Sequence, residues 1–275
     1  MGRAVMHAGV GGRLHRYSCC AGLEPCGTVS PMKPTVSDRI SPRDLMARDH
    51  LDHYFRVGEG AINEIERLLD NEPERILDLP CGHGRLMRWL RAAYPYAEIV
   101  GCDLDPDAVN FCAETFGSTP VQSHEDPAKI RIEGKFDLIV CGSLLTHLNG
   151  HRWPGFLSFF HNHLDGLLVF STNGPKVREL LTAACQYGAG GPASKTALAR
   201  LGAQWFRSLT LGSILSMMDG YDRIGFGHAP YAKQDNYGLS VSSPEWVKGQ
   251  LRDFELVSYR VGVWGGSQDA VAVRA

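Results

Sequence analysis

Residues 75–86 read RILDLPCGHGRL, and this short stretch decides how the rest of the chain is interpreted. The apolar run closed by Asp78 predicts a strand, residues 80–84 predict a tight turn, and Leu86 begins a helical pattern. Such a turn directs free helix N-terminal N–H groups at whatever lies above the strand end, and its glycines let a ligand approach the backbone closely. We therefore interpret residues 78–84, called the glycine-rich turn below, as a ligand-binding element.

Strand-like and helix-like segments alternate along the chain around this turn. After the first strand, we expect strands at 97–103, 119–122, 136–142 and 166–172, and helices at 41–46 (a single turn), 53–70, 85–95, 105–117, 152–164 and 243–251. Two closing strands, 254–264 and 269–275, predict a C-terminal antiparallel pair. This alternation predicts an α/β fold with a doubly wound, mostly parallel sheet. The glycine-rich turn, Asp103 and residues 142–147 should then share the edge where ligands bind in such sheets.

Two segments do not follow this alternation of strands and helices. Residues 1–35 show no periodicity and are expected to form a disordered tail, and residues 36–275 are expected to form a single domain. Residues 175–243 contain helix-like pieces and an aromatic, glycine-rich stretch, so we interpret them as a helical insertion that forms a lid on the substrate side. Two interpretations of the aromatic residues in 225–237 stay open: a mobile pocket cover, or an ordered connection whose aromatic residues fill a core.

Composition excludes several classes of protein. The chain has 275 residues, 44% hydrophobic and 21% charged, and a formal net charge of −2 without a block of Lys and Arg, so we expect no nucleic-acid partner. No apolar run reaches the ~18 residues that a membrane span requires. The eight cysteines include no C-x-x-C pair, which predicts no metal site and favours reduced thiols in a cytoplasmic protein.

The order of these elements resembles the class I S-adenosylmethionine-dependent methyltransferases. The resemblance covers residues 55–174 and 243–275 and depends on the glycine-rich turn, the acid after the second strand, the FDLIV strand and the closing strand pair. That family writes an acid followed by G-x-G-x-G, whereas this chain has Pro80 in place of the first glycine, a departure that also occurs among relatives. The resemblance implies a Rossmann-like fold, S-adenosylmethionine as cofactor, and methyltransferase activity.

The resemblance also implies roles for individual residues. Asp78 would orient the methionine amino group, the backbone of Gly82 and Gly84 would contact the methionine and ribose, and Asp103 would accept both ribose hydroxyls. A carboxylate suits a vicinal diol because it offers two acceptor oxygens. The remaining residues expected at the cofactor are Pro80, Cys81 and His83 in the turn, Leu104, Ser123 and His124 around the adenine, and Cys141.

His147 is the candidate catalytic residue. It lies just beyond the fourth strand, where cofactor and substrate meet in this family, and a hydroxyl nucleophile would need a base to accept its proton. A structural or cofactor-side role for His147 stays open, and His151, His228 and Tyr231 are weaker candidates. The chain lacks the N-P-P-Y or D-P-P-Y sequence that amino methylation would suggest, so we expect an O-methyltransferase acting on a small-molecule, glycan or lipid-linked acceptor.

Two alternatives to this enzyme remain at the level of the sequence. The first is a non-catalytic protein that keeps the fold as a binding module. The second is an NAD-dependent oxidoreductase, because an acid after the second strand also binds ribose there. Its G-x-G-x-x-G fingerprint would need a third glycine, and this chain has Met87 at that position after Gly82 and Gly84.

Overall fold

The computed structural model describes residues 35–48, 51–186, 209–232 and 234–275. Residues 35–275 form one unit around a seven-stranded sheet with the order β3-β2-β1-β4-β5-β9-β8. Its strands are β1 (Arg75–Asp78), β2 (Glu98–Asp103), β3 (Thr119–Gln122), β4 (Phe136–Cys141), β5 (Leu164–Thr172), β8 (Glu255–Trp264) and β9 (Gln268–Arg274). β1 to β5 pair in parallel, and β9 pairs antiparallel with β5 and with β8. This confirms the predicted sheet and its closing strand pair.

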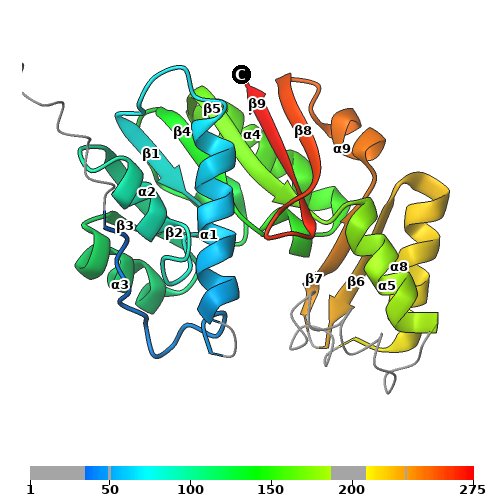
Figure 1. Ribbon diagram of the computed structural model, residues 1–275. Helices are drawn as coiled ribbons and strands as arrows, with labels where there is room; N and C mark the ends of the chain where they lie inside the picture. Colours follow the sequence, from blue (N-terminus) through cyan, green and yellow to red (C-terminus); the bar gives the residue numbers. More distant parts are fainter. Residues whose placement is uncertain (1–34, 49–50, 187–208, 233) are drawn as a thin grey trace, which may run out of the picture. The chain divides into compact units, whose positions relative to one another are not determined.

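Helices cover both faces of the sheet (Figure 1). Neighbouring strand residues point to opposite faces, and in β1 Ile76 belongs to one buried apolar cluster while Leu77 belongs to another. The first cluster also contains residues of α1 (Leu51–Glu66), α2 (Met87–Ala93) and α3 (Pro106–Phe116), and the second contains residues of α4 (Trp153–His163) and α9 (Pro244–Gln250). The doubly wound arrangement is therefore confirmed.

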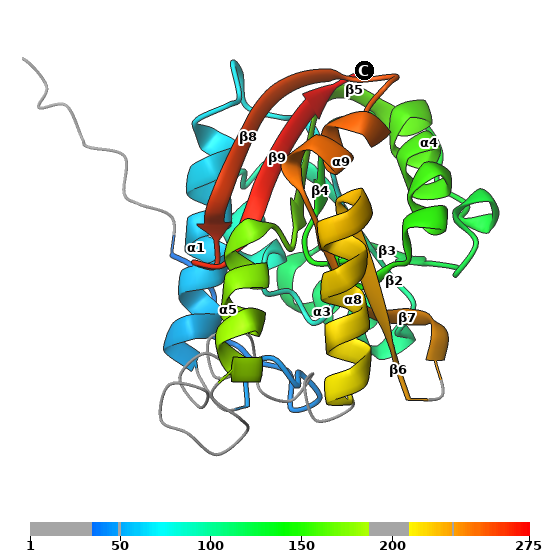
Figure 2. The ribbon, with the colours of Figure 1, turned by 90° about the vertical axis from the view of Figure 1, so that its right-hand side faces the viewer.

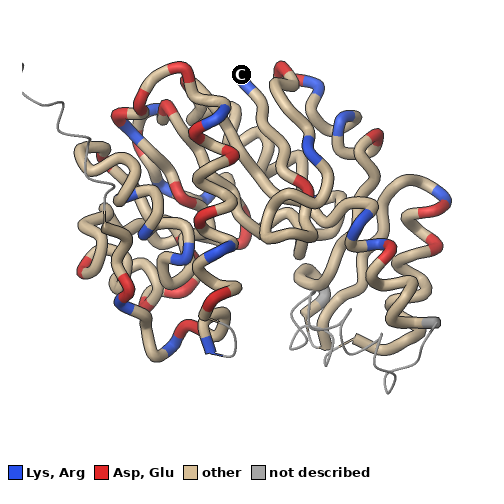
Figure 3. The backbone as a smooth tube through the Cα atoms, in the orientation of Figure 1, with Lys and Arg blue, Asp and Glu red and all other residues tan. Residues whose placement is uncertain are grey.

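The helices begin and end where capping residues in the sequence predict. In α3, the Asp105 side chain accepts a hydrogen bond from the Asp107 backbone N–H, Pro106 begins the helix, and Gly117 follows it with a φ of 65°. Proline suits the first turn because the N–H it lacks would have no partner there. Residues 41–46, expected to form a helical turn, instead form isolated turns. Acidic and basic residues are interspersed along the described part of the chain (Figure 3).

The segment between β5 and α9 contains helices, as expected, and also a hairpin that the sequence did not predict. It contains α5 (Pro175–Gln186) and α8 (Leu211–Ile224), but the aromatic stretch forms an antiparallel hairpin of β6 (Phe226–Tyr231) and β7 (Gln234–Ser242) (Figure 2). Residues from all four elements, including Val177, Met217 and Tyr231, form a third buried apolar cluster. The insertion is thus a mixed layer with its own core, in which the aromatic stretch adds a hairpin to the expected helices.

The glycines of the hairpin explain why the sequence pattern was misleading. A Cβ at Gly227 would lie 1.7 Å from the Met217 carbonyl oxygen, and one at Gly238 would lie 2.1 Å from the Ala229 carbonyl oxygen. These glycines permit close packing of backbones, which supports the interpretation as an ordered connection whose aromatic residues fill a core. Residues 1–34 of the expected tail and residues 187–208 of the expected insertion lie outside the described residues.

Candidate cofactor and acceptor site

The two glycines of the glycine-rich turn have different roles. Both have positive φ, 48° at Gly82 and 82° at Gly84, which favours glycine. A Cβ at Gly84 would lie 2.2 Å from the Phe116 ring, whereas a Cβ at Gly82 would meet no atom within 4 Å. Gly84 therefore lets the turn pack against α3, and Gly82 borders space that a ligand can use.

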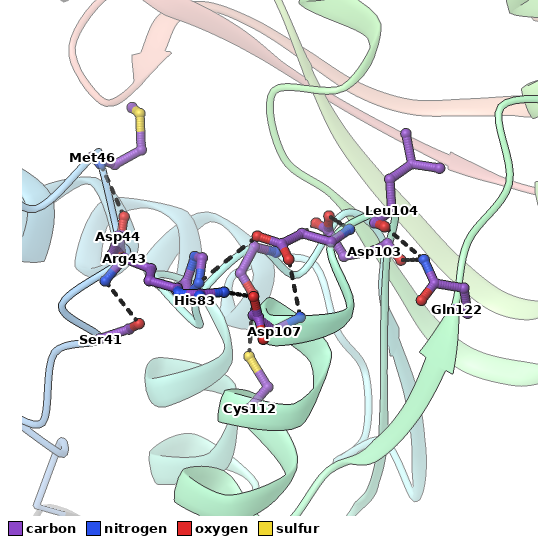
Figure 4. Close-up of polar contacts among 12 residues, drawn as sticks. Ser41, Arg43, Asp44, Met46, His83, Asp103, Leu104, Asp107, Cys112 and Gln122 are labelled. Carbon is purple, nitrogen blue, oxygen red and sulfur yellow. Dashed lines mark hydrogen bonds and ion pairs between the residues drawn. The ribbon is translucent and has the colours of Figure 1, made fainter.

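Asp103, at the end of β2, is tied to this turn. Its Oδ2 accepts a hydrogen bond of 2.8 Å from the Gly82 backbone N–H, and its Oδ1 accepts one of 3.0 Å from Asp105 (Figure 4). Burial raises the pKa of Asp103, and these two bonds partly offset the shift. Because each carboxylate oxygen has a second lone pair, both can accept further hydrogen bonds from a ligand. The next residue, Leu104, is 55% exposed and offers an apolar surface beside the carboxylate.

Asp78 is buried without a hydrogen-bond partner. Its relative exposure is 1%, and neither carboxylate oxygen has a partner among the described residues. Burial and then the nearby Asp103 raise the pKa of Asp78 well above its ordinary value, against an opposing effect of Arg85. A buried carboxyl without a partner is costly, so this position is suited to a cationic ligand group.

The other residues expected in the turn are mostly packed within the protein. Cys81 is 4% exposed, and hydrogen bonding to Cys112 and burial raise its pKa. Cys112 donates through its sulfur to the Gly82 carbonyl oxygen at 3.3 Å. Pro80 is partly exposed, and the His83 Nε2 lies 4.0 Å from the Asp105 carboxylate. The turn would thus contact a ligand mainly through its backbone.

Cys141, at the end of β4, also lies within the protein. Its relative exposure is 0%, it belongs to the apolar cluster on the α4 face, and burial raises its pKa. A thiol in this environment is poorly reactive, because the thiolate is its nucleophilic form. Cys141 therefore contributes packing at this edge.

The start of the loop after β3 is bound to the Asp103 edge. The Ser123 backbone N–H donates to the Asp103 carbonyl oxygen at 2.8 Å. The Gln122 side chain donates to the Leu104 carbonyl oxygen at 2.6 Å (Figure 4). His124 is exposed, and its Nδ1 accepts from the Asp126 N–H at 2.9 Å. Ser123 thus lies beside the predicted ribose carboxylate. From the sequence, Ser123 and His124 were chosen among residues 122–126 as the adenine contacts, whereas the pairing of Gln122 opposite Asp103 in the β2–β3 register would have favoured Gln122.

His147 lies in a 3-10 turn, η2 (Leu145–His147), beyond the end of β4. Its Nδ1 lies 2.8 Å from the Gly238 carbonyl oxygen and 3.1 Å from the Tyr231 hydroxyl. Since a carbonyl can only accept, Nδ1 carries a proton and Nε2 is the basic nitrogen. Burial lowers the pKa of His147 to about 4, so the ring is neutral at neutral pH. Its neighbours come from β6 and β7, which sequence spacing could not reveal.

Tyr237 on β7 connects the hairpin with the Asp103 edge. Its ring centre lies 4.9 Å from that of His147, and its backbone forms a β-bridge with Leu148. Burial and then the charge of Asp103 raise the pKa of Tyr237 to about 12. Of the weaker candidates, Tyr231 contacts His147 directly, whereas His151 lines an open surface hollow of about 490 Å³ beside this edge, together with His124, Lys129, Arg152 and Asn236.

Comparisons with known proteins agree with this geometry. A family model described as a methyltransferase domain matches residues 77–166. This match includes the glycine-rich turn, Asp103 and β4, and it agrees with the resemblance of the sequence to the S-adenosylmethionine-dependent methyltransferases. An S-adenosylmethionine-dependent methyltransferase from Clostridium acetobutylicum superimposes on it with a TM-score of 0.50, at 14% identity over 83% of this chain and 94% of that one. The PH0226 protein from Pyrococcus horikoshii gives a TM-score of 0.54, at 15% identity over 81% and 91% of the two chains.

Two curated proteins of related sequence are described as enzymes of the same activity. The malonyl-[acyl-carrier protein] O-methyltransferase of Legionella pneumophila is 32% identical over 54% of this chain and 55% of its own length. The protein of the same description from Bacillus cereus is 29% identical over 44% and 45%. The chain thus spans about half the length of the curated relatives it matches. The match to a methyltransferase domain favours the methyltransferase interpretation over the oxidoreductase alternative.

The residues at this edge fit the cofactor of the family. The Asp78 carboxyl, which no described residue pairs, suits an ammonium group. The lone pairs left on Asp103, beside the open space at Gly82, suit a ribose, and the exposed Leu104 suits an adenine. Among the described helices, none is long and apolar enough to cross a membrane.

Proposed function

We propose that this chain transfers a methyl group from S-adenosylmethionine to an oxygen atom of its acceptor. The observation that supports this most strongly is the pairing of the Asp103 carboxylate with the Gly82 N–H beside open space. In this proposal, Asp103 accepts the ribose hydroxyls, Leu104 packs on the adenine, and Ser123 lies at its edge. His124 is a weaker adenine contact than the sequence indicated, because Asp126 already uses its Nδ1.

Methyl transfer places few chemical demands on the protein beyond position. When bound, the cofactor supplies a methyl group on a positively charged sulfur, which reacts by in-line displacement. The protein must hold the acceptor oxygen in line and, for a hydroxyl acceptor, remove its proton. We assign proton acceptance to Nε2 of His147, because the Nδ1–H bond to Gly238 fixes the ring in the required tautomer. A carboxylate acceptor would not need this step.

The names of the relatives guide the choice of acceptor. Those proteins are described as malonyl-[acyl-carrier protein] O-methyltransferases, so a carrier-linked carboxyl group is the first acceptor to test. Small-molecule, glycan and lipid-linked hydroxyl compounds follow, as the sequence suggested. A cytoplasmic location stays a prediction.

The test is turnover with S-adenosylmethionine across these acceptors, followed by mass spectrometry of the product. We expect one methyl group on an oxygen of one acceptor class, and His147→Gln should lower kcat at neutral pH only if that oxygen is a hydroxyl. Cofactor binding without methylation of any acceptor would favour the non-catalytic alternative.

A further inference from the structure

Two arginines one helical turn apart differ in how their guanidinium groups are satisfied. Arg88 is 1% exposed and donates to the carbonyl oxygens of Gly84, Ser37 and Arg39 and to the Tyr54 hydroxyl. Arg85 directly follows the glycine-rich turn, and its guanidinium forms no hydrogen bond within the described residues. Arg88 therefore attaches α2 to the N-terminal segment, whereas Arg85 keeps its donors available.

Protein surrounds most of the Arg85 side chain but leaves part of it exposed to solvent. Burial is the main cause that lowers its pKa, opposed by the nearby Tyr54, Asp44 and Asp78, and yet the side chain keeps part of its surface accessible. The Arg85 side chain is thus largely surrounded by protein but still accessible from solvent. Asp44 does not satisfy Arg85 by a hydrogen bond, and its Oδ1 already accepts from the Met46 N–H at 2.9 Å.

Arg85 and Asp78 thus place opposite charges beside the glycine-rich turn, and neither side chain forms a hydrogen bond with the described part of the chain. Buried charges are tolerated when a partner with good hydrogen-bond geometry satisfies them. A ligand that brings a cation to Asp78 and an anion to Arg85 satisfies both, and an α-amino acid group carries these two charges on one carbon. The planar guanidinium matches a carboxylate through two parallel hydrogen bonds.

We propose that Arg85 binds the α-carboxylate of the methionine part of the cofactor, opposite the ammonium group at Asp78. This inference rests on the proposed function and makes it more specific. It predicts that the protein selects ligands that carry a complete amino acid group.

A ligand comparison tests the proposal without turnover. The pair is S-adenosylhomocysteine and its decarboxylated analogue, S-adenosyl-3-thiopropylamine, which keeps the ammonium group and lacks the carboxylate. Calorimetry of the wild type should give roughly 10- to 100-fold tighter binding of S-adenosylhomocysteine, the range expected for hydrogen bonds between charged groups. Arg85→Gln should abolish this preference by weakening only the carboxylate ligand. Arg85→Lys, which keeps the charge without the planar fork, should retain part of it and guards against a folding defect in Arg85→Gln.

Four results would overturn the proposal. Equal wild-type affinity for the two ligands, or a preference that survives in Arg85→Gln, would remove Arg85 from the carboxylate while leaving the proposed function in place. Equal weakening of both ligands in Arg85→Gln would make Arg85 a structural residue like Arg88. Binding of neither ligand by the wild type would overturn the proposed function together with this inference.

Discussion

The glycine-rich turn and the contact between His147 and the β6–β7 hairpin lie at the same edge of the sheet, but they differ in whether their buried polar side chains have hydrogen-bond partners within the described chain. At the turn, both oxygens of Asp78 are buried, and neither has a hydrogen-bond partner among the residues that the structure describes. At the hairpin, His147 Nδ1 is bonded to the Gly238 carbonyl and contacts the Tyr231 hydroxyl. We propose that a ligand completes the first region, whereas the chain itself completes the second. Substitutions in the first should therefore affect mainly binding, and substitutions in the second should affect mainly stability.

The largest expected effect is a loss of stability on substitution of Gly84, the residue of the turn that packs against α3 and does not face open space. Gly84→Ala places a methyl group within 2.2 Å of the Phe116 ring, and we expect a loss of about 3 kcal/mol or more in the free energy of unfolding from overpacking and left-handed strain. Gly82→Ala, the matched control, meets no atom and should cost only about 1 kcal/mol while weakening cofactor binding. Urea unfolding followed by circular dichroism measures both. Equal destabilisation by the two variants would contradict the division of roles.

The pH dependence of stability probes the hairpin side. The pKa of His147 is lowered from 6.5 to about 4, so between these values the unfolded chain binds more protons than the folded one. Stability should rise with pH across this window, by about 3 kcal/mol in total from this residue. His147→Gln should flatten the slope between pH 4 and 6.5 in urea titrations. A slope unchanged by the substitution would show that His147 is not buried in its neutral form.

Asp78→Asn should separate stability from binding. Because the pKa of Asp78 is raised in the folded state, its carboxyl lowers stability increasingly as pH rises above the unfolded value near 3.8. The amide should therefore stabilise the ligand-free protein by about 1–2 kcal/mol at pH 7 and weaken S-adenosylhomocysteine binding. Melting temperature and calorimetry give the two readings. A variant that is less stable and binds normally would place Asp78 in a structural role.

The smallest expected effect concerns Tyr237, which lies between the two regions. No described residue forms a hydrogen bond with its hydroxyl, so Tyr237→Phe should change stability by less than about 0.5 kcal/mol. If the hydroxyl faces the acceptor, KM for the acceptor should rise several-fold while S-adenosylhomocysteine affinity stays unchanged. The reverse pattern would move Tyr237 to the cofactor side.

Local sequence predicted the turn side better than the hairpin side, for a physical reason. Asp78, Gly82 and Gly84 are close in sequence, and the parallel pairing of β1 and β2 brings Asp103 to them. His147 was found from its position after a strand, but its partners Tyr231 and Gly238 are 84 and 91 residues away. The hairpin was missed because its glycines obscure strand alternation and serve close packing instead.

Arg85 shows a further limit of the sequence. It lies between Gly84 and the apolar residues that begin α2, where an arginine is ordinarily a solvated helix residue. Only the fold shows that the neighbouring Arg88 is satisfied by backbone carbonyls while Arg85 is not. Whether a buried charge is satisfied depends on tertiary contacts, which periodicity does not encode.

The central claim is that the edge formed by the glycine-rich turn and Asp103 binds the cofactor, and calorimetry with S-adenosylhomocysteine tests it most directly. The wild type should bind, Asp103→Ala should bind roughly 100-fold more weakly because two hydroxyl contacts to a charged acceptor are lost, and Glu114→Ala, an exposed acid on α3, should bind like the wild type. Absence of binding by the wild type, or equal affinity in Asp103→Ala, would contradict the account.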